Sequence, residues 1–93
     1  MVQAPRFGKA KKRMPAAAQR ATDDAVRAIM ANPLVGEPKV GALKGVRVLK
    51  FKVKTLELLL AYQCEARRKI IEVLDVGPHA NFYRELQQYL DAR

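Results

Sequence analysis

Apolar residues recur three and four positions apart at both ends of the chain, which is the spacing of a helix face. The pattern predicts three helices, over residues 5–13, 15–31 and 81–91. Pro15 suits the first turn of the second helix, and Asn81 is a residue type that often caps the start of a helix. The chain is therefore expected to begin with two helices and to end with one.

Between these helices residues 47–54 and 56–65 alternate between apolar and polar positions or carry apolar residues along one face, which is the period of a β-strand. Residues 69–76 are apolar on both faces, which suits a central or doubly covered strand, so three strands are predicted. The short gaps at Thr55 and around Ala66–Arg68 favour antiparallel hairpins. This order of elements predicts an α+β fold, in which the two N-terminal helices pack on a small antiparallel sheet, a three-stranded meander, followed by a C-terminal helix.

The length of the chain limits what the fold can hold. With 93 residues, 1–93 is expected to be a single domain with one compact core. A deep pocket for a large cofactor is not expected, so we predict no cofactor and an open or shallow site. The sequence contains no long apolar run for a membrane span, no secretory signal, and Cys64 as its only cysteine. These features favour a cytoplasmic protein.

The charge of the chain is strongly asymmetric. The net charge is +9, and residues 1–54 hold 13 basic and 3 acidic side chains, whereas residues 55–93 hold 5 basic and 6 acidic ones. A field concentrated in one half of a small protein favours a directed, polyanionic partner, and nucleic acid is the commonest one. The alternative is a basic surface without a partner.

Three lysines alternate along the first predicted strand. Lys50, Lys52 and Lys54 would emerge on one face about 6.6–6.8 Å apart, with Arg47 close by. Such a ridge can hold a phosphate backbone in register, so RNA binding is predicted for it. Taken alone, alternating lysines are more often a solvated outer face of a sheet.

His79, Tyr83 and Arg84 follow the last predicted strand and open the final helix. Imidazole exchanges a proton near neutral pH, which suits acid–base work. Tyr83 could lean back toward His79. The alternatives are a solvent-exposed or capping histidine, a tyrosine packed where helix and sheet meet, and an exposed arginine.

Several familiar sites are excluded by the residue types present. One histidine and one cysteine cannot form a His/Cys zinc site, and the acidic residues lack the spacing of a calcium loop. The sequence has no GxxxxGK[ST] phosphate loop and no GxSxG elbow. Catalysis, if present, is expected to be metal-independent and to use Lys, Arg, His and Tyr.

Three stretches, which cover about two-thirds of the chain, resemble the RelE/ParE toxin superfamily. They are ANPLVGEPKVGALKGVRVLKFKVK (31–54), LELLLAYQCEARRKIIEVLDVG (56–77) and GPHANFYRELQQYL (77–90). The last is similar to a G-x-H-E-N-F-Y-R-D-L signature of one branch, from which it departs at Ala80, where that branch has glutamate, and at Glu85. Alanine at position 80 removes a carboxylate that could act as a base or as a helix cap, so the resemblance does not supply a strong acid–base pair here.

The resemblance implies the toxin of a type II toxin–antitoxin system, neutralised by a cognate antitoxin with an acidic, partly disordered segment. RelE-like members cut messenger RNA, usually on the ribosome. By this resemblance Lys50 and Lys52 would stabilise phosphate and His79 would assist proton transfer. Tyr83, with Arg84 beside it, would support the base or act in acid–base chemistry itself. Arg47 and Lys54 would bind RNA.

Two other functions remain open at this point. ParE-like members share the fold but inhibit DNA gyrase and carry out no nuclease chemistry. A basic RNA-binding module without catalysis is the third possibility. Convergence of Lys50, Lys52, His79 and Tyr83 on one face would favour the endonuclease.

Overall fold

The computed structural model describes residues 1–65 and 67–93. In chain order the elements are β1 (Val2–Gln3), α1 (Pro5–Lys12), α2 (Ala16–Ala31), β2 (Glu37–Pro38), the 3₁₀ turn η1 (Gly41–Leu43), β3 (Val46–Val53), β4 (Leu56–Glu65), β5 (Ile70–Pro78) and α3 (Phe82–Asp91). The three predicted long strands and three predicted helices are all present, with bounds within a few residues of the expected ones. The turn predicted around Ala66–Arg68 includes Ala66, which lies outside the described residues.

The sheet has five strands in the order β1-β5-β4-β3-β2. β3, β4 and β5 form the expected antiparallel meander, but β1 adds to β5 in parallel and β2 adds to β3 in antiparallel fashion. The expectation of a three-stranded antiparallel sheet was therefore wrong in detail, since the sheet is mixed and five-stranded. The two added strands are two residues long, too short to show any alternation in the sequence.

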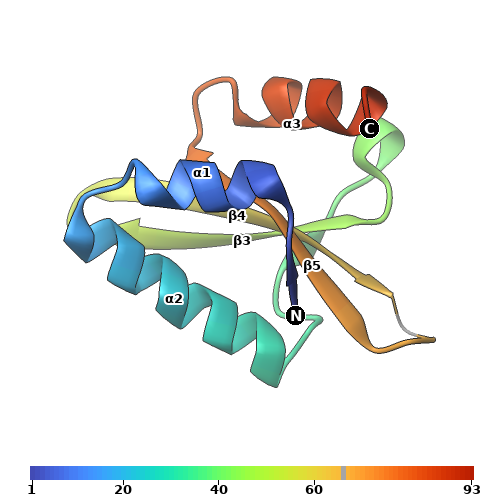
Figure 1. The fold of residues 1–93 in the computed structure, drawn as a ribbon, viewed down its shortest axis with the longest axis horizontal. Helices are drawn as coiled ribbons and strands as arrows, with labels where there is room; N and C mark the ends of the chain where they lie inside the picture. The colour runs from blue at the N-terminus through green and yellow to red at the C-terminus, as the bar shows by residue number, and fades with distance from the viewer. Residues whose placement is uncertain (66) are drawn as a thin grey trace.

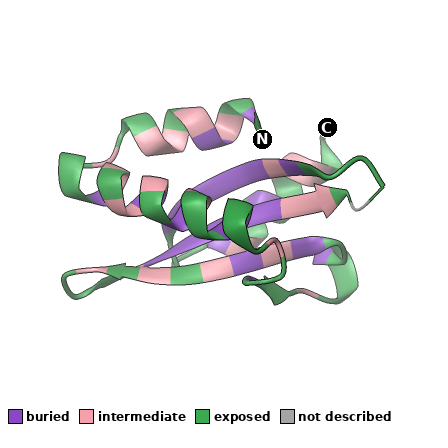
Figure 2. Cartoon of the chain, turned by 90° about the horizontal axis from the view of Figure 1, so that it is seen from below, coloured by how far each residue is buried: buried purple, intermediate pink, exposed green. Residues whose placement is uncertain are grey.

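Helices cover both faces of the sheet (Figure 1), and each face has its own core. On one face Leu60 and Tyr62 pack with Phe7 of α1 and Ile29 of α2. On the other face the intervening residues of β4 pack with Val46 and Val48 of β3 and with Phe82 and Leu86 of α3. Alternate residues of β4 therefore contribute to two different cores. Figure 2 shows the buried residues concentrated in the strands between the helices.

The buried Tyr62 hydroxyl fastens the loop that follows α2. It donates a hydrogen bond of 2.7 Å to the Pro33 carbonyl and accepts one of 2.9 Å from the Gly36 amide. A Cβ atom at position 36 would lie 2.7 Å from the Tyr62 ring, so only glycine fits this contact. The loop therefore enters β2 along a path fixed by one buried side chain.

The start of α3 differs from expectation. Asn81 lies in the left-handed region with φ 59° and ψ 5°, and its side chain makes no capping hydrogen bond. Asparagine tolerates this backbone conformation better than most residues. Its role is thus to turn the chain sharply from β5 into α3, and the prediction of a side-chain cap was wrong.

None of the described helices combines the length and the apolar character that would be needed to cross a bilayer.

Replacing Tyr62 with phenylalanine should lower the free energy of unfolding by about 1–3 kcal/mol, because the Gly36 amide would be left buried without its acceptor. Urea unfolding followed by circular dichroism measures this change. Tyr89→Phe is the matched control, since Tyr89 is only half-buried on α3, and it should have a smaller effect. Equal losses in the two variants would show that the hydroxyl of Tyr62 does not anchor the loop.

Candidate functional site

Lys50 and Lys52 lie on the sheet face that α3 covers. They continue the alternation of Val46 and Val48, which belong to the same core as Phe82 and Leu86 of α3, and both lysines are exposed. Leu49 and Phe51, which alternate with the lysines along β3, pack on the opposite face with residues of α1 and α2. The two lysine side chains therefore extend from β3 on the same face of the sheet as the core shared with α3.

The sheet register brings the end of β5 close to these lysines. Lys50 and Gly77 both pair with Leu59, so their backbones are two strand spacings, about 10 Å, apart. Two residues further along β3, Lys52 pairs with Glu57 of β4. On the other side of β4, Pro78 pairs with Leu58 and ends β5, and His79 follows it directly. The strand ends thus gather two cations and the only histidine in one region.

His79 and Tyr83 form a contact pair across the turn into α3. Their ring centroids are 5.6 Å apart with an interplanar angle of 83°, an edge-to-face arrangement. Tyr83 makes a second edge contact with Phe82, which is buried against the sheet. Phe82 therefore supports the ring of Tyr83 from the side of the sheet, while His79 remains exposed to solvent.

Lys39, which sequence reasoning did not single out, completes this cluster. Its Nζ lies 4.9 Å from the centroid of the Tyr83 ring and 3.5 Å from a Glu37 carboxylate oxygen. The Lys39 amide donates to the Val46 carbonyl, which fixes the backbone next to β3. We name Lys39, Lys50, Lys52, His79 and Tyr83 the α3-face cluster.

The environment of Lys39 favours its charged form. Desolvation works to lower the pKa of Lys39, but the Tyr83 side chain and the Glu37 carboxylate together raise it above its usual value of 10.5. Lys39 therefore carries a full positive charge at neutral pH. It is suited to stabilising an anion and not to removing a proton.

Two of the other predicted site residues, Arg47 and Lys54, are placed differently from the cluster. Arg47 points to the opposite face of the sheet, where its guanidinium donates to the carbonyls of Gly36 at 2.8 Å and Leu34 at 3.3 Å. Lys54 lies beyond β3 in the hairpin turn with φ 57°, so it is not on the strand face with Lys50 and Lys52. Arg84 is exposed on α3. The structure thus offers a structural explanation for Arg47, and RNA binding by these side chains stays a prediction.

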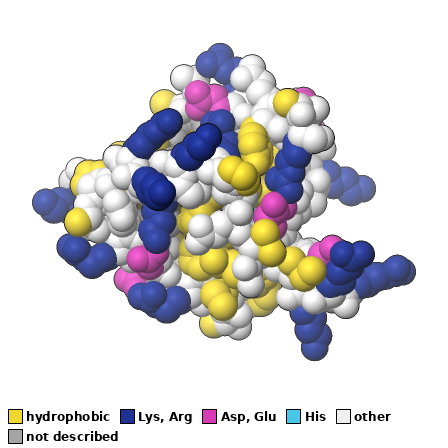
Figure 3. Space-filling view, viewed as in Figure 1, with side chains coloured by type: hydrophobic (Ala, Val, Ile, Leu, Met, Phe, Trp, Pro, Cys, Tyr) yellow, Lys and Arg dark blue, Asp and Glu magenta, His cyan; other side chains and the backbone are white. Residues whose placement is uncertain are grey.

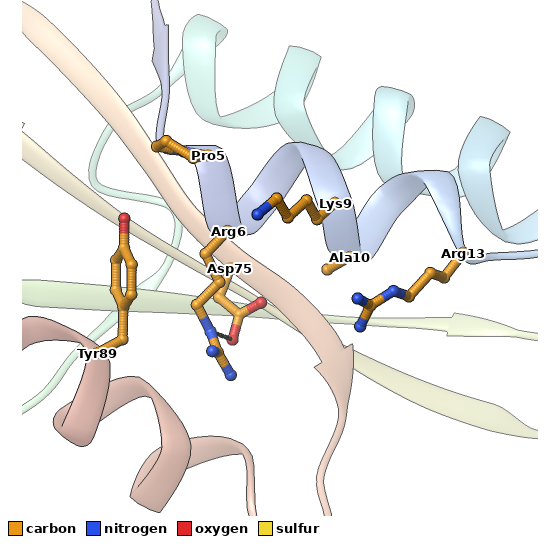
Figure 4. Close-up of a pocket in the computed structure, with 7 residues that line it drawn as sticks. All are labelled: Pro5, Arg6, Lys9, Ala10, Arg13, Asp75 and Tyr89. Atoms are coloured by element: carbon orange, nitrogen blue, oxygen red, sulfur yellow. Dashed lines mark hydrogen bonds and ion pairs between the residues drawn. The ribbon is translucent and has the colours of Figure 1, made fainter.

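A second polar feature lies on the other side of α3, at the outer edge of β5. The Asp75 carboxylate accepts a hydrogen bond of 2.9 Å from the Arg6 guanidinium and another of 2.9 Å from the Val76 amide. Burial raises the pKa of Asp75 above its usual value of 3.8, although the Arg6 guanidinium and the Val76 amide work to lower it. This ion pair joins α1 to β5 and lies at the centre of the cavity drawn in Figure 4.

The arrangement of the sheet and helices is similar to that of solved toxin structures. It is similar to the E. coli RelBE toxin–antitoxin complex (16% identity, TM-score 0.67, covering 83% of this chain and 92% of that chain). It is also similar to the isolated E. coli RelE toxin (15% identity, TM-score 0.66, 96% and 95% covered). A doubly substituted RelE in the free state gives 15% identity and a TM-score of 0.70, with 94% and 87% covered. At these identities the likeness concerns the fold.

The family assignment comes from the sequence itself. Residues 1–87 match the family model of the ParE-like toxin of type II bacterial toxin–antitoxin systems. The chain therefore belongs to this family and is a toxin of the RelE/ParE kind. No curated protein shows a sequence match to it.

The raised pKa of Asp75 predicts a pH-dependent stability. An acid whose pKa is raised by folding contributes stability that is present below its unfolded pKa and is lost as the pH rises through the folded value. The free energy of unfolding of the wild type, minus that of Asp75→Asn, should therefore fall as the pH rises above 3.8. Urea titrations of both proteins between acidic and neutral pH measure this difference. A difference that grows with pH would contradict the assigned direction.

Proposed function

We propose that the protein is a metal-independent endoribonuclease toxin that cleaves messenger RNA. The observation that carries this proposal is the α3-face cluster, in which three lysines, a histidine and a tyrosine share one side of the sheet. Gyrase inhibition or simple RNA binding would not require a histidine held against a tyrosine between cations. The family itself does not decide between these activities.

The cluster supplies the groups that RNA cleavage requires. In such a reaction the ribose 2′-oxygen attacks the adjacent phosphorus, a base accepts the 2′-hydroxyl proton, and the 5′-oxygen of the next nucleotide leaves with a proton from an acid. His79 is the exposed group suited to proton transfer, and one positioned acid or base contributes about 10²–10⁴-fold. Lys39, Lys50 and Lys52 would stabilise the charge that develops on the phosphate.

Tyr83 has the position of a base-stacking platform. Its ring is half-buried, supported by Phe82, and flanked by His79 and Lys39. Single-stranded RNA is commonly recognised by stacking of splayed bases on aromatic side chains. Arg84, one residue further along α3, would add a phosphate contact.

The partner that this function requires is an antitoxin. The E. coli RelE structures include a complex with RelB and one with a RelB peptide. For this chain, with its net charge of +9, we propose an acidic antitoxin, with mRNA as the substrate and a cytoplasmic setting.

Inhibition of DNA gyrase is the second candidate, because the family model that matches is the ParE-like one. Induced expression in a sensitive bacterium, followed at once by mapping of transcript ends and a supercoiling assay, separates the two. Early cleavage of transcripts with normal supercoiling is the expected result. Intact transcripts with impaired supercoiling would replace the endonuclease proposal with the second candidate.

Lys50→Ala combined with Lys52→Ala should relieve growth arrest and lower RNA cleavage by about 10²-fold or more, since stabilising charge is lost where the phosphate would lie. The fold should remain intact, because both side chains are exposed. Arg67→Ala combined with Arg68→Ala removes the same charge at the other end of β4 and is the matched control. Unchanged arrest in the lysine variant would count against the cluster.

Lys39→Met should lower cleavage by about 10–100-fold, because the ring of Tyr83 and the reacting phosphate would both lose a fixed cation. Lys39→Arg, which keeps the charge, should restore part of the activity. The control is Lys44→Met, which removes an exposed lysine after η1. The rates come from cleavage of a fluorescent RNA by the purified variants, and equal rates for Lys39→Met and Lys44→Met would remove Lys39 from the cluster.

A further inference from the structure

Two adjoining cavities lie beside α1, and no residue of the α3-face cluster lines either of them. The smaller has a volume of about 330 Å³ and the larger about 410 Å³. Four residues belong to the walls of both: Arg6, Ala10, Arg13 and Asp75. The cavities therefore form one groove, which extends from Tyr89 on α3 to Ala80 at the turn before α3. Volumes of this size suit a small molecule.

The larger cavity is lined mainly by apolar side chains. Met14 follows α1, Leu56 and Leu58 belong to β4, and Phe82 begins α3. Leu58 and Phe82 are almost completely buried, whereas Leu56 is 50% exposed and lies where the cavity opens to solvent. An apolar group that covered Leu56 and filled the cavity would remove this surface from water, which is favourable.

The polar groups in the walls of the larger cavity already have partners. The Asp75 carboxylate accepts hydrogen bonds of 2.9 Å from both the Arg6 guanidinium and the Val76 amide. Pro15 and Pro78, which also line this cavity, have no amide hydrogen. Among the described residues, no buried side-chain nitrogen or oxygen lacks a hydrogen-bond partner. A nucleobase or a sugar would therefore lose hydrogen bonds to water here, whereas an alkyl chain has none to lose.

The wall that α1 contributes is cationic. Arg6 and Arg13 point from α1 into the space that Asp75 borders (Figure 4), and Lys9 lies between them on the same side of the helix. Lys and Arg side chains also gather over α1 in Figure 3.

The charges of this wall are not all compensated within the groove. Arg6 is engaged by both acids of the walls, Asp75 at 2.9 Å and Glu85 at 3.9 Å. Lys9 and Arg13 form no ion pair with any acid in the described part of the chain. The rim therefore offers two cations to an anionic group, next to an apolar cavity.

We propose that the groove binds a single-chain amphiphilic anion, of which a medium-chain fatty acid is the simplest example. The alkyl chain lies in the larger cavity against Met14, Leu56 and Phe82, and the carboxylate pairs with Lys9 and Arg13. This ligand site goes beyond the proposed function and does not depend on it, because the two use different residues.

Decanoate is the probe, titrated into the full-length protein by isothermal calorimetry below the concentration at which it forms micelles. One molecule should bind per protein, at least 10-fold more tightly than butyrate, because each additional methylene that is fully buried contributes up to about 4-fold. Decyltrimethylammonium has the same chain with a cationic head and should bind at least 10-fold more weakly than decanoate.

Lys9→Gln combined with Arg13→Gln should weaken decanoate binding by about 10-fold or more, since the carboxylate loses both cations. Arg67→Gln combined with Arg68→Gln gives the same net charge at a distant hairpin, and its Kd should stay close to that of the wild type. Leu56→Gln should weaken decanoate binding but leave butyrate binding unchanged. All five side chains are exposed, so the variants should fold, which circular dichroism checks.

Nuclear magnetic resonance locates the ligand independently of the variants. Decanoate should shift the amide signals of Met14 and Ala80, which border the larger cavity, and leave those of Lys39 and Lys50 in place. Shifts confined to the α3-face cluster would contradict the assignment of the ligand to the groove.

Other results would overturn the proposal as well. These are an absence of decanoate binding, equal losses in the two double variants, and equal affinity for decyltrimethylammonium. A single-stranded RNA oligonucleotide that displaces decanoate, and whose own affinity depends on Lys9 and Arg13 but not on Leu56, would assign the groove to nucleic acid instead. RNA cleavage by the groove variants is measured separately, so failure of either proposal leaves the other standing.

Discussion

The pairing register of β3, β4 and β5 is the constraint on which the rest of the structure depends. The middle of β4 is buried on both faces, and its residues divide between two cores: Leu60 and Tyr62 pack toward α1 and α2, and Leu59 and Ala61 toward α3. A slip of one residue would exchange the two sets. Because Lys50 pairs with Leu59, the same register that fills the core also places the lysines on the face of α3.

Interactions on one face of the sheet position residues on the other. Tyr62 and Arg47 hold the loop after α2 from the side of α1 and α2, through hydrogen bonds to its backbone. That loop continues into β2, and two residues later Lys39 reaches the ring of Tyr83 on the opposite side. Arg47 of β3 and Tyr62 of β4 thus hold the loop in place, and they affect the cluster through the path of the chain.

The sequence was sufficient for elements with a repeated pattern and insufficient for features made by tertiary contact. Alternation over eight to ten residues identified β3 and β4, and helical spacing identified α1, α2 and α3. The two-residue strands carry no periodicity, and Asn81 turns the chain through a left-handed backbone that its residue type alone does not specify. His79 and Tyr83 were expected to approach each other because both flank one turn. Lys39 was not expected, because its place depends on a loop that Gly36 and Tyr62 define.

Helix α3 contributes to both the α3-face cluster and the cavity walls beside α1. Tyr83 faces Lys39 and the strand ends, while Phe82 and Glu85 line the groove beside α1. The helix is held on the sheet mainly by the buried side chains of Phe82 and Leu86. The cavity walls beside α1 therefore include the helix that carries Tyr83, whereas Lys50 and Lys52 lie on the far side of β4. So small a domain can keep the cavities and the α3-face cluster on separate surfaces because one short amphipathic helix presents a different side to each.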